Sequence, residues 1–140
     1  MNTKLFWAIG LFLIVISCQS ESLDIRRTFP FQLQLDAFPP QIPIHKPTSV
    51  GFSIRPEYLM SGNAYTFTWQ ITAPQQGIMV LNHQVVSPGG KALVFANAGK
   101  LMTDTLTYVP TDSGAHQLTL HFYDTMGQQK DTSFTLTAVK

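Results

Sequence analysis

The sequence contains a single cysteine, Cys18, and no cluster of basic residues. One cysteine cannot form a disulfide within the chain, so a disulfide-stabilised fold is excluded. Lys and Arg together number 9 against 8 Asp and Glu, and the only adjacent basic pair is Arg26-Arg27. Binding to nucleic acid needs several phosphate contacts from clustered Lys and Arg. The chain is therefore not expected to bind nucleic acid directly.

Motifs of catalysis are also missing. The chain has no Gly-x-Ser-x-Gly elbow, no His-Glu-x-x-His and no Ser-x-x-Lys. Ser113 lies beside Asp112 and near His116, which could be a fragment of a catalytic triad. The run Asp112-Ser113-Gly114 is more typical of a tight turn, in which Asp bonds its own backbone and Gly adopts a positive φ. We expect a turn here and no enzyme activity.

The four histidines do not form a pattern of metal ligands. His45 and His83 are predicted in or near loops, with no Asp, Glu or Cys at ligand spacing. His116 and His121 are five residues apart on a predicted strand, so their side chains point to opposite faces. Asp124 is expected to begin a turn, which offers too few oxygen atoms for calcium. The sequence therefore predicts no metal site and no cofactor.

One long apolar run is present, from Leu5 to Ile16, preceded by Lys4. Its 12 residues would span about 18 Å as a helix, short of the ~30 Å hydrocarbon layer, so a transmembrane anchor is not expected. The basic end, the apolar core and the small Ser17 predict a secretory signal peptide over residues 1–17. Val15-Ile16-Ser17-Cys18 resembles a bacterial lipobox, in which Cys18 becomes the lipid-bearing first residue of the mature chain. The alternative is an ordinary cleaved signal followed by an incidental cysteine.

Removal of residues 1–17 would leave 123 residues (140 − 17), which suits one domain. The removed part contains one charged residue, Lys4. The mature chain would therefore have 8 basic and 8 acidic residues and a net charge of zero. Residues 18–28 are polar and lack periodicity, and we interpret them as a tether between the lipid and the domain. The domain itself is predicted over residues 29–140.

From Thr28 onward, apolar and polar residues alternate in short bursts separated by Pro, Gly, Asn and Asp. This pattern is typical of half-buried strands and turns. The most regular burst places Tyr65, Phe67, Trp69 and Ile71 on one face. No amphipathic pattern lasts three helical turns. The strands predicted elsewhere cover residues 29–35, 50–54, 78–81, 92–95, 103–109, 117–123 and 132–139. About seven strands at this spacing predict an all-β sandwich.

A short motif narrows the sandwich to the immunoglobulin type. Asp112-Ser113-Gly114-Ala115-His116-Gln117-Leu118 resembles the Asp-x-Gly-x-Tyr-x-Cys entry into strand F of immunoglobulin domains, with His116 at the position of the corner tyrosine. Leu118 then stands in place of one cysteine, and Phe52 or Ile54 in place of the other. An apolar contact would replace the disulfide between the sheets. The expected core residues are Trp69, lying opposite Leu118, together with Phe52, Ile54 and Leu120.

Several segments near both ends of the predicted domain form a recognisable set, namely Leu23-Asp24-Ile25, Phe29-Pro30-Phe31, His45-Lys46, Leu106-Thr107-Tyr108, residues 118–124 and the turn Asp124-x-x-Gly127-Gln128. Together these segments resemble the TraQ family of conjugal transfer lipoproteins encoded on Bacteroides-type conjugative elements. Met126 departs from the family at a position that is often aromatic, and the loop Ser61 to Asn63 and residues 75–100 match nothing in it. The resemblance implies a non-enzymatic accessory component of a DNA-transfer apparatus, held at the cell envelope by its lipid.

Two classes of function remain open from the sequence. A component of the transfer apparatus would bind other envelope proteins through an edge strand or through loops such as Met60 to Ala64. A surface adhesin or glycan-binding lipoprotein would instead use aromatic residues such as Tyr58 or Tyr65 as a platform. The short polar run after Cys18 has one acidic residue, Glu21, which favours the periplasmic face of the outer membrane over the cell surface.

Overall fold

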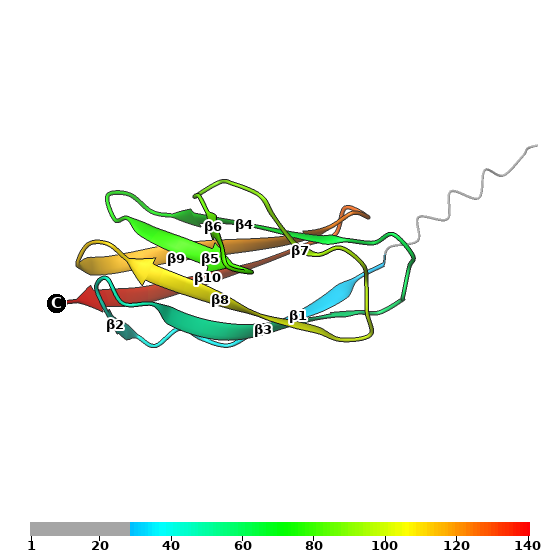
Figure 1. The fold of residues 1–140 in the computed structure, drawn as a ribbon, viewed down its shortest axis with the longest axis horizontal. Coiled ribbons are helices and arrows are strands. Elements are labelled where there is room, and N and C mark those ends of the chain that lie inside the picture. Colours follow the sequence, from blue (N-terminus) through cyan, green and yellow to red (C-terminus); the bar gives the residue numbers. More distant parts are fainter. Residues whose placement is uncertain (1–28) are drawn as a thin grey trace, which may run out of the picture.

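The computed structural model describes residues 29–140, which form two packed β-sheets (Figure 1). The signal peptide over residues 1–17, the lipid site at Cys18 and the tether over residues 18–28 lie outside the described residues. No helix occurs between residues 29 and 140. The fold is an all-β sandwich, as the alternating sequence pattern predicted.

Each sheet has five strands. In spatial order, the first sheet contains β1 (Phe31–Leu35), β3 (Thr48–Pro56), β8 (Met102–Pro110), β5 (Gly77–Leu81) and β6 (Gln84–Val86). The second sheet contains β2 (Gln41–Pro43), β10 (Gln129–Val139), β9 (Gly114–Asp124), β4 (Tyr65–Ile71) and β7 (Ala92–Phe95). All neighbouring strands pair antiparallel except β2 and β10, which pair parallel.

The strand order is that of an immunoglobulin-type sandwich. The series β1-β3-β8-β5 corresponds to strands A, B, E and D, and β10-β9-β4 corresponds to G, F and C. The chain departs from that plan between β4 and β8, where it enters the first sheet as β5 and β6 before it returns to the second sheet as β7. This segment lies within residues 75–100, the stretch that matched no family pattern.

Two strands were not predicted from the sequence. Strands β2 and β6 have three residues each, too few to show an alternating pattern. Strand β2 lies in a proline-rich stretch, with Pro39, Pro40 and Pro43, outside the strand ranges predicted from the sequence. Its extended conformation is stabilised by pairing with β10, because the amide of Thr137 on β10 donates to the carbonyl of Pro40 at 2.8 Å. The structure therefore has ten strands, eight of which overlap the ranges predicted from the sequence.

Trp69 is fully buried, and its surroundings correct one detail of the prediction. Its register partner on β9 is Leu120, whereas Leu118 lies opposite Ile71. Trp69, Leu118 and Leu120 are nevertheless all core residues. The indole Nε1–H donates to the carbonyl of Val86 on β6, at 2.7 Å, so this donor is satisfied by a strand of the other sheet. Trp69 thus links the two sheets by packing and by a hydrogen bond.

The apolar contact across the sheets involves Phe52 and Phe122. Both side chains are buried, on β3 and β9, and their ring centroids lie 5.2 Å apart. Phe52 therefore occupies the predicted core position on the strand equivalent to B, with Ile54 buried two residues further along. The aromatic partner on the F-equivalent strand is Phe122 instead of the predicted Leu118. Aromatic pairs at this separation stabilise a core beyond their buried area.

Candidate interaction site

His116, the strongest catalytic candidate in the sequence, is a buried corner residue. Its imidazole is fully buried, and Nε2–H donates to the carbonyl of Asp112 at 3.0 Å. The Tyr108 hydroxyl lies 2.7 Å from Nδ1 and donates to it when the imidazole is neutral. A hydrogen bond to the backbone four residues upstream is the role that the corner tyrosine has in immunoglobulin domains. The geometry assigns His116 to fold stability, with both ring nitrogens engaged.

The neighbouring residues also form a structural turn. Gly114 has φ of 126°, as the predicted turn requires. The Asp112 carboxylate, however, accepts a hydrogen bond from the amide of Gln76 at 2.9 Å, not from its own turn as we had expected. Burial, reinforced by the charge of Asp112, raises the pKa of Tyr108 above its ordinary value. Through its hydrogen bond with Gln76, Asp112 joins the β8–β9 loop to the β4–β5 loop at one end of the sandwich.

The other histidines are separated from His116 and from one another. His121 lies on the opposite face of β9, partly exposed, with Nδ1 2.8 Å from a carboxylate oxygen of Asp131. Hydrogen bonds from Gln129 and from His121 lower the pKa of Asp131. His45 and His83 occupy turns with positive φ, at 58° and 62°. Between residues 29 and 140, no group of three or more His, Cys, Asp or Glu side chains could hold a metal ion.

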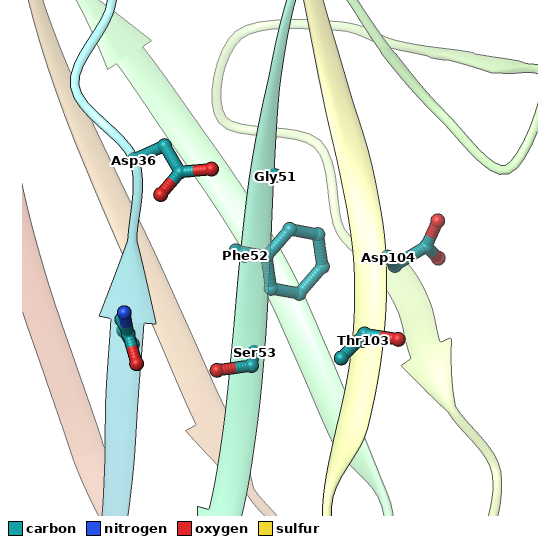
Figure 2. Close-up of a pocket in the computed structure, with 7 residues that line it drawn as sticks. Asp36, Gly51, Phe52, Ser53, Thr103 and Asp104 are labelled. Carbon is teal, nitrogen blue, oxygen red and sulfur yellow. The ribbon is translucent and has the colours of Figure 1, made fainter.

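A polar groove runs across the outer face of the first sheet, over β1, β3 and β8 (Figure 2). It consists of two adjoining hollows of about 270 Å³ and 500 Å³, lined by Gln32, Leu33, Gln34, Asp36, Gly51, Phe52, Ser53, Arg55, Leu101, Thr103 and Asp104. Most of these side chains carry amide, hydroxyl or charged groups. We call this surface the polar groove.

The two carboxylates of the polar groove differ in direction. Figure 2 shows Asp36 pointing towards Gly51 on β3, whereas Asp104 points away from β3. A Cβ atom at residue 51 would lie only 2.9 Å from Oδ2 of Asp36, so glycine lets this carboxylate lie close to β3. The smaller hollow, with both carboxylates, can therefore accept hydrogen bonds and attract cationic side chains, whereas Arg55 lines the larger hollow. Sequence reasoning missed it, because Gln34, Asp36 and Thr103 look like ordinary exposed positions of alternating strands.

The loop Met60 to Ala64, predicted as a possible binding loop, is largely fixed to the domain. Asn63 is only 2% exposed. Its side-chain oxygen accepts from the amide and the hydroxyl of Thr125, at 3.2 and 2.8 Å, and its amide nitrogen lies 3.4 Å from Asp124. Asp124 in turn accepts from the amides of Met126 and Gln128 and so begins the predicted turn. The free part of the loop is its tip, Ser61 and Gly62.

The proposed aromatic platform is wrong for Tyr65. This side chain is completely buried, and its pKa is raised by burial and by the nearby Asp124 charge. Tyr58 is 55% exposed, but it packs edge-on against Phe29, with ring centroids 6.0 Å apart. The two tyrosines therefore do not form one surface. A glycan platform of stacked aromatic rings is not present at these positions.

The edge strands are short, which limits pairing with a partner strand. The edges are β1 and β6 in one sheet and β2 and β7 in the other, with five, three, three and four residues. Val85 on β6 and Leu93 on β7 are exposed apolar residues.

Across residues 29–140, no helix has the length and apolar character needed to cross a membrane.

Comparison with solved structures finds the same fold in lipoproteins of Bacteroides species. A lipoprotein from Bacteroides thetaiotaomicron matches with a TM-score of 0.68 at 15% identity, over 86% of this chain and 88% of that chain. A conjugative transposon lipoprotein from Bacteroides eggerthii matches with a TM-score of 0.65 at 16% identity, over 78% of this chain and 98% of that chain. A conjugate transposon protein from Bacteroides vulgatus matches with a TM-score of 0.55 at 17% identity, over 83% of this chain and 90% of that chain.

Comparisons with protein-family models and with curated proteins give no match. At these identities the structural likenesses show that the fold is shared.

Proposed function

We propose that this chain is an exported, lipid-anchored accessory component of a conjugative DNA-transfer apparatus, which acts through protein contacts and not through catalysis. The observation that carries this proposal is the fold shared with a conjugative transposon lipoprotein over 98% of that chain. The segments that resemble the TraQ family support it independently, since they were read from the sequence alone. The buried and fully bonded His116 supports a structural, non-catalytic role for the candidate triad.

The anchor in this proposal is a lipid on Cys18. The lipobox-like tetrad ends at this residue, and lipidation would consume the only thiol of the chain. One acyl chain gives reversible membrane binding, whereas two or more give stable attachment. The proposed location is the periplasmic face of the outer membrane.

The polar groove is the surface to which we assign partner docking. It lies on the outer face of three paired strands, β1, β3 and β8. Exposed Asp36 and partly exposed Asp104 provide negative charge for a partner with basic side chains. Since Asn63 fixes the loop Met60 to Ala64, the groove is favoured over this loop.

The test is the mating efficiency of the parent conjugative element after deletion of this gene. The wild-type gene, a Cys18→Ala form and a Ser22→Ala form as control are returned in trans. We expect loss of transfer on deletion, with restoration by wild type and by Ser22→Ala but not by Cys18→Ala. Undiminished transfer in the deletion strain would contradict the proposed role. Restoration by Cys18→Ala would show that the lipid is dispensable.

A glycan-binding lipoprotein is the second candidate, and the polar groove is the observation that favours it. Amide, hydroxyl and carboxylate groups such as those of Gln34, Ser53 and Asp36 are suited to sugar hydroxyls. The groove has no exposed aromatic ring for stacking, because Phe52 is buried beneath it. Binding of the purified protein to a glycan array, combined with undiminished transfer in the deletion strain, would move this candidate to first place.

A further inference from the structure

Exposed apolar side chains gather at one end of the sandwich. Tyr58, Leu59, Leu101 and Met126 are between 41% and 55% exposed, and all lie in the loops β3–β4, β7–β8 and β9–β10 or at their borders. Figure 1 shows these loops at the end opposite the C-terminus. We call these four residues the apolar end.

Hydrogen bonds and a ring contact join two of these loops, β3–β4 and β9–β10, to each other and to the start of the described chain. The amide of Glu57 donates to the carbonyl of Pro30, and Tyr58 packs on Phe29. The amide of Thr125 donates to the carbonyl of Ala64 at 3.1 Å, which fixes the β9–β10 turn with Met126 against the β3–β4 loop.

The opposite end of the described domain is different. Its loops cover residues 44–47, 72–76 and 111–113, and none of the large exposed hydrophobic residues lies in them. The remaining ones, Ile78, Val85 and Leu93, belong to strands β5, β6 and β7. Large exposed apolar side chains in the loops of one end and in none of the loops of the other indicate that the first end makes a contact, because exposed apolar patches often mark interaction sites.

The start of the described chain indicates what this contact is. Phe29 and Pro30 lie at the apolar end, in contact with Tyr58 and Glu57. Residues 19–28 separate Phe29 from Cys18, and a chain of this length reaches at most about 40 Å. A lipid on Cys18 would therefore attach the domain to the bilayer through its apolar end. Tyr58 combines an apolar ring with a polar tip, which suits the level of lipid headgroups.

We propose that the apolar end rests on the membrane, with Tyr58, Leu59, Leu101 and Met126 inserted at the boundary between headgroups and acyl chains. This inference rests on the proposed lipid anchor at Cys18. Lys100, beside Leu101, places a cation where it can meet anionic headgroups while its stem covers apolar surface. In this orientation the larger hollow of the polar groove begins beside the membrane, at Leu101, and the smaller hollow, with Asp36 and Asp104, lies further along the side of the domain.

The test uses the full-length lipoprotein, purified with its lipid and reconstituted into vesicles of phosphatidylethanolamine and phosphatidylglycerol. Lipidated Cys18 has no free thiol, so an environment-sensitive fluorophore reacts only with an introduced cysteine. The probe is placed by Met126→Cys at the apolar end, by Ser113→Cys at the opposite end and by Val85→Cys on an exposed apolar edge. We expect a blue shift and strong quenching by brominated lipid at residue 126, and neither at residues 113 or 85.

A second variant separates insertion from simple proximity. In the Met126→Cys background, Tyr58→Ser with Leu59→Ser should reduce the quenching while the protein still floats with the vesicles. Equal quenching at all three positions, or none at residue 126, would overturn the proposal. Shielding of residue 126 from iodide without quenching by brominated lipid would indicate a protein contact, such as a second copy of the chain, and would also overturn it.

Intact mass and flotation report on the anchor separately. An unmodified Cys18 with no flotation would remove both the anchor and this inference. A lipidated, floating protein with an unquenched residue 126 would remove the inference alone.

Discussion

At the residue scale, the pair formed by Tyr108 and His116 is a buried polar contact that the core must satisfy. We predict that Tyr108→Phe lowers the free energy of unfolding by about 1–3 kcal/mol, because it leaves Nδ1 of the fully buried His116 without its partner. Tyr123→Phe is the matched control, since this partly exposed tyrosine lies on the outer face of β9, and its effect should be within about 0.5 kcal/mol. Urea denaturation measures both. Equal losses in the two variants would contradict the role of the pair.

The raised pKa values of Tyr108 and Tyr65 predict a loss of stability in alkali. The fold keeps both phenols protonated, whereas the unfolded chain loses these protons near the ordinary pKa of about 10. The contribution is therefore complete below about pH 10 and is lost as the pH rises towards the folded-state values. Denaturation between about pH 8 and 11 should show this fall, and Tyr108→Phe should make it shallower. A pH profile unchanged by the substitution would count against Tyr108 as a source.

At the element scale, Asn63 connects the β3–β4 loop to the β9–β10 turn. Asn63→Ala removes its bonds to Thr125 and Asp124, and we predict a loss of about 1–3 kcal/mol in the free energy of unfolding. Amide exchange at Thr125 should accelerate, because the turn loses its attachment. Ser61→Ala, at the exposed tip of the same loop, should change neither quantity. Faster exchange in both variants would indicate that the whole loop is mobile irrespective of Asn63.

The same elements show what the sequence could predict. The long strands were predicted because their buried residues alternate, as with Phe67 and Trp69 on β4. Strands β2 and β6 could not be found, since three residues carry no period and their pairing depends on distant partners. The corner position of His116 was predicted correctly, because His116 follows Gly114 by two residues in the sequence, as the corner tyrosine follows the glycine in the immunoglobulin motif. The burial of Asn63 and the polar groove depend on contacts between segments far apart in the sequence, which local patterns do not record.

At the scale of the whole molecule, an anchor at one end determines which surfaces a partner can reach. With the apolar end on the membrane, the polar groove on the outer face of β1, β3 and β8 faces sideways and is accessible to a neighbouring envelope protein. Electrostatic contacts from Asp36 and Asp104 would then guide docking. The fold provides rigidity for this purpose, because the groove lies on paired strands and not on a loop.

This arrangement predicts that transfer depends on the two carboxylates. Removal of charge-assisted contacts worth about 1.4 kcal/mol weakens a docking interaction about tenfold, so Asp36→Asn combined with Asp104→Asn should reduce mating efficiency. The free energy of unfolding should change little, because Asp36 is exposed and Asp104 is only partly buried. Asp131→Asn is the control, since it removes an exposed carboxylate from the second sheet, and the contact of Asp131 with His121 lies at the surface, where such contacts contribute little to stability. Normal transfer in the double variant, with protein levels equal to wild type, would exclude the groove and direct attention to Val85 and Leu93 on the short edge strands.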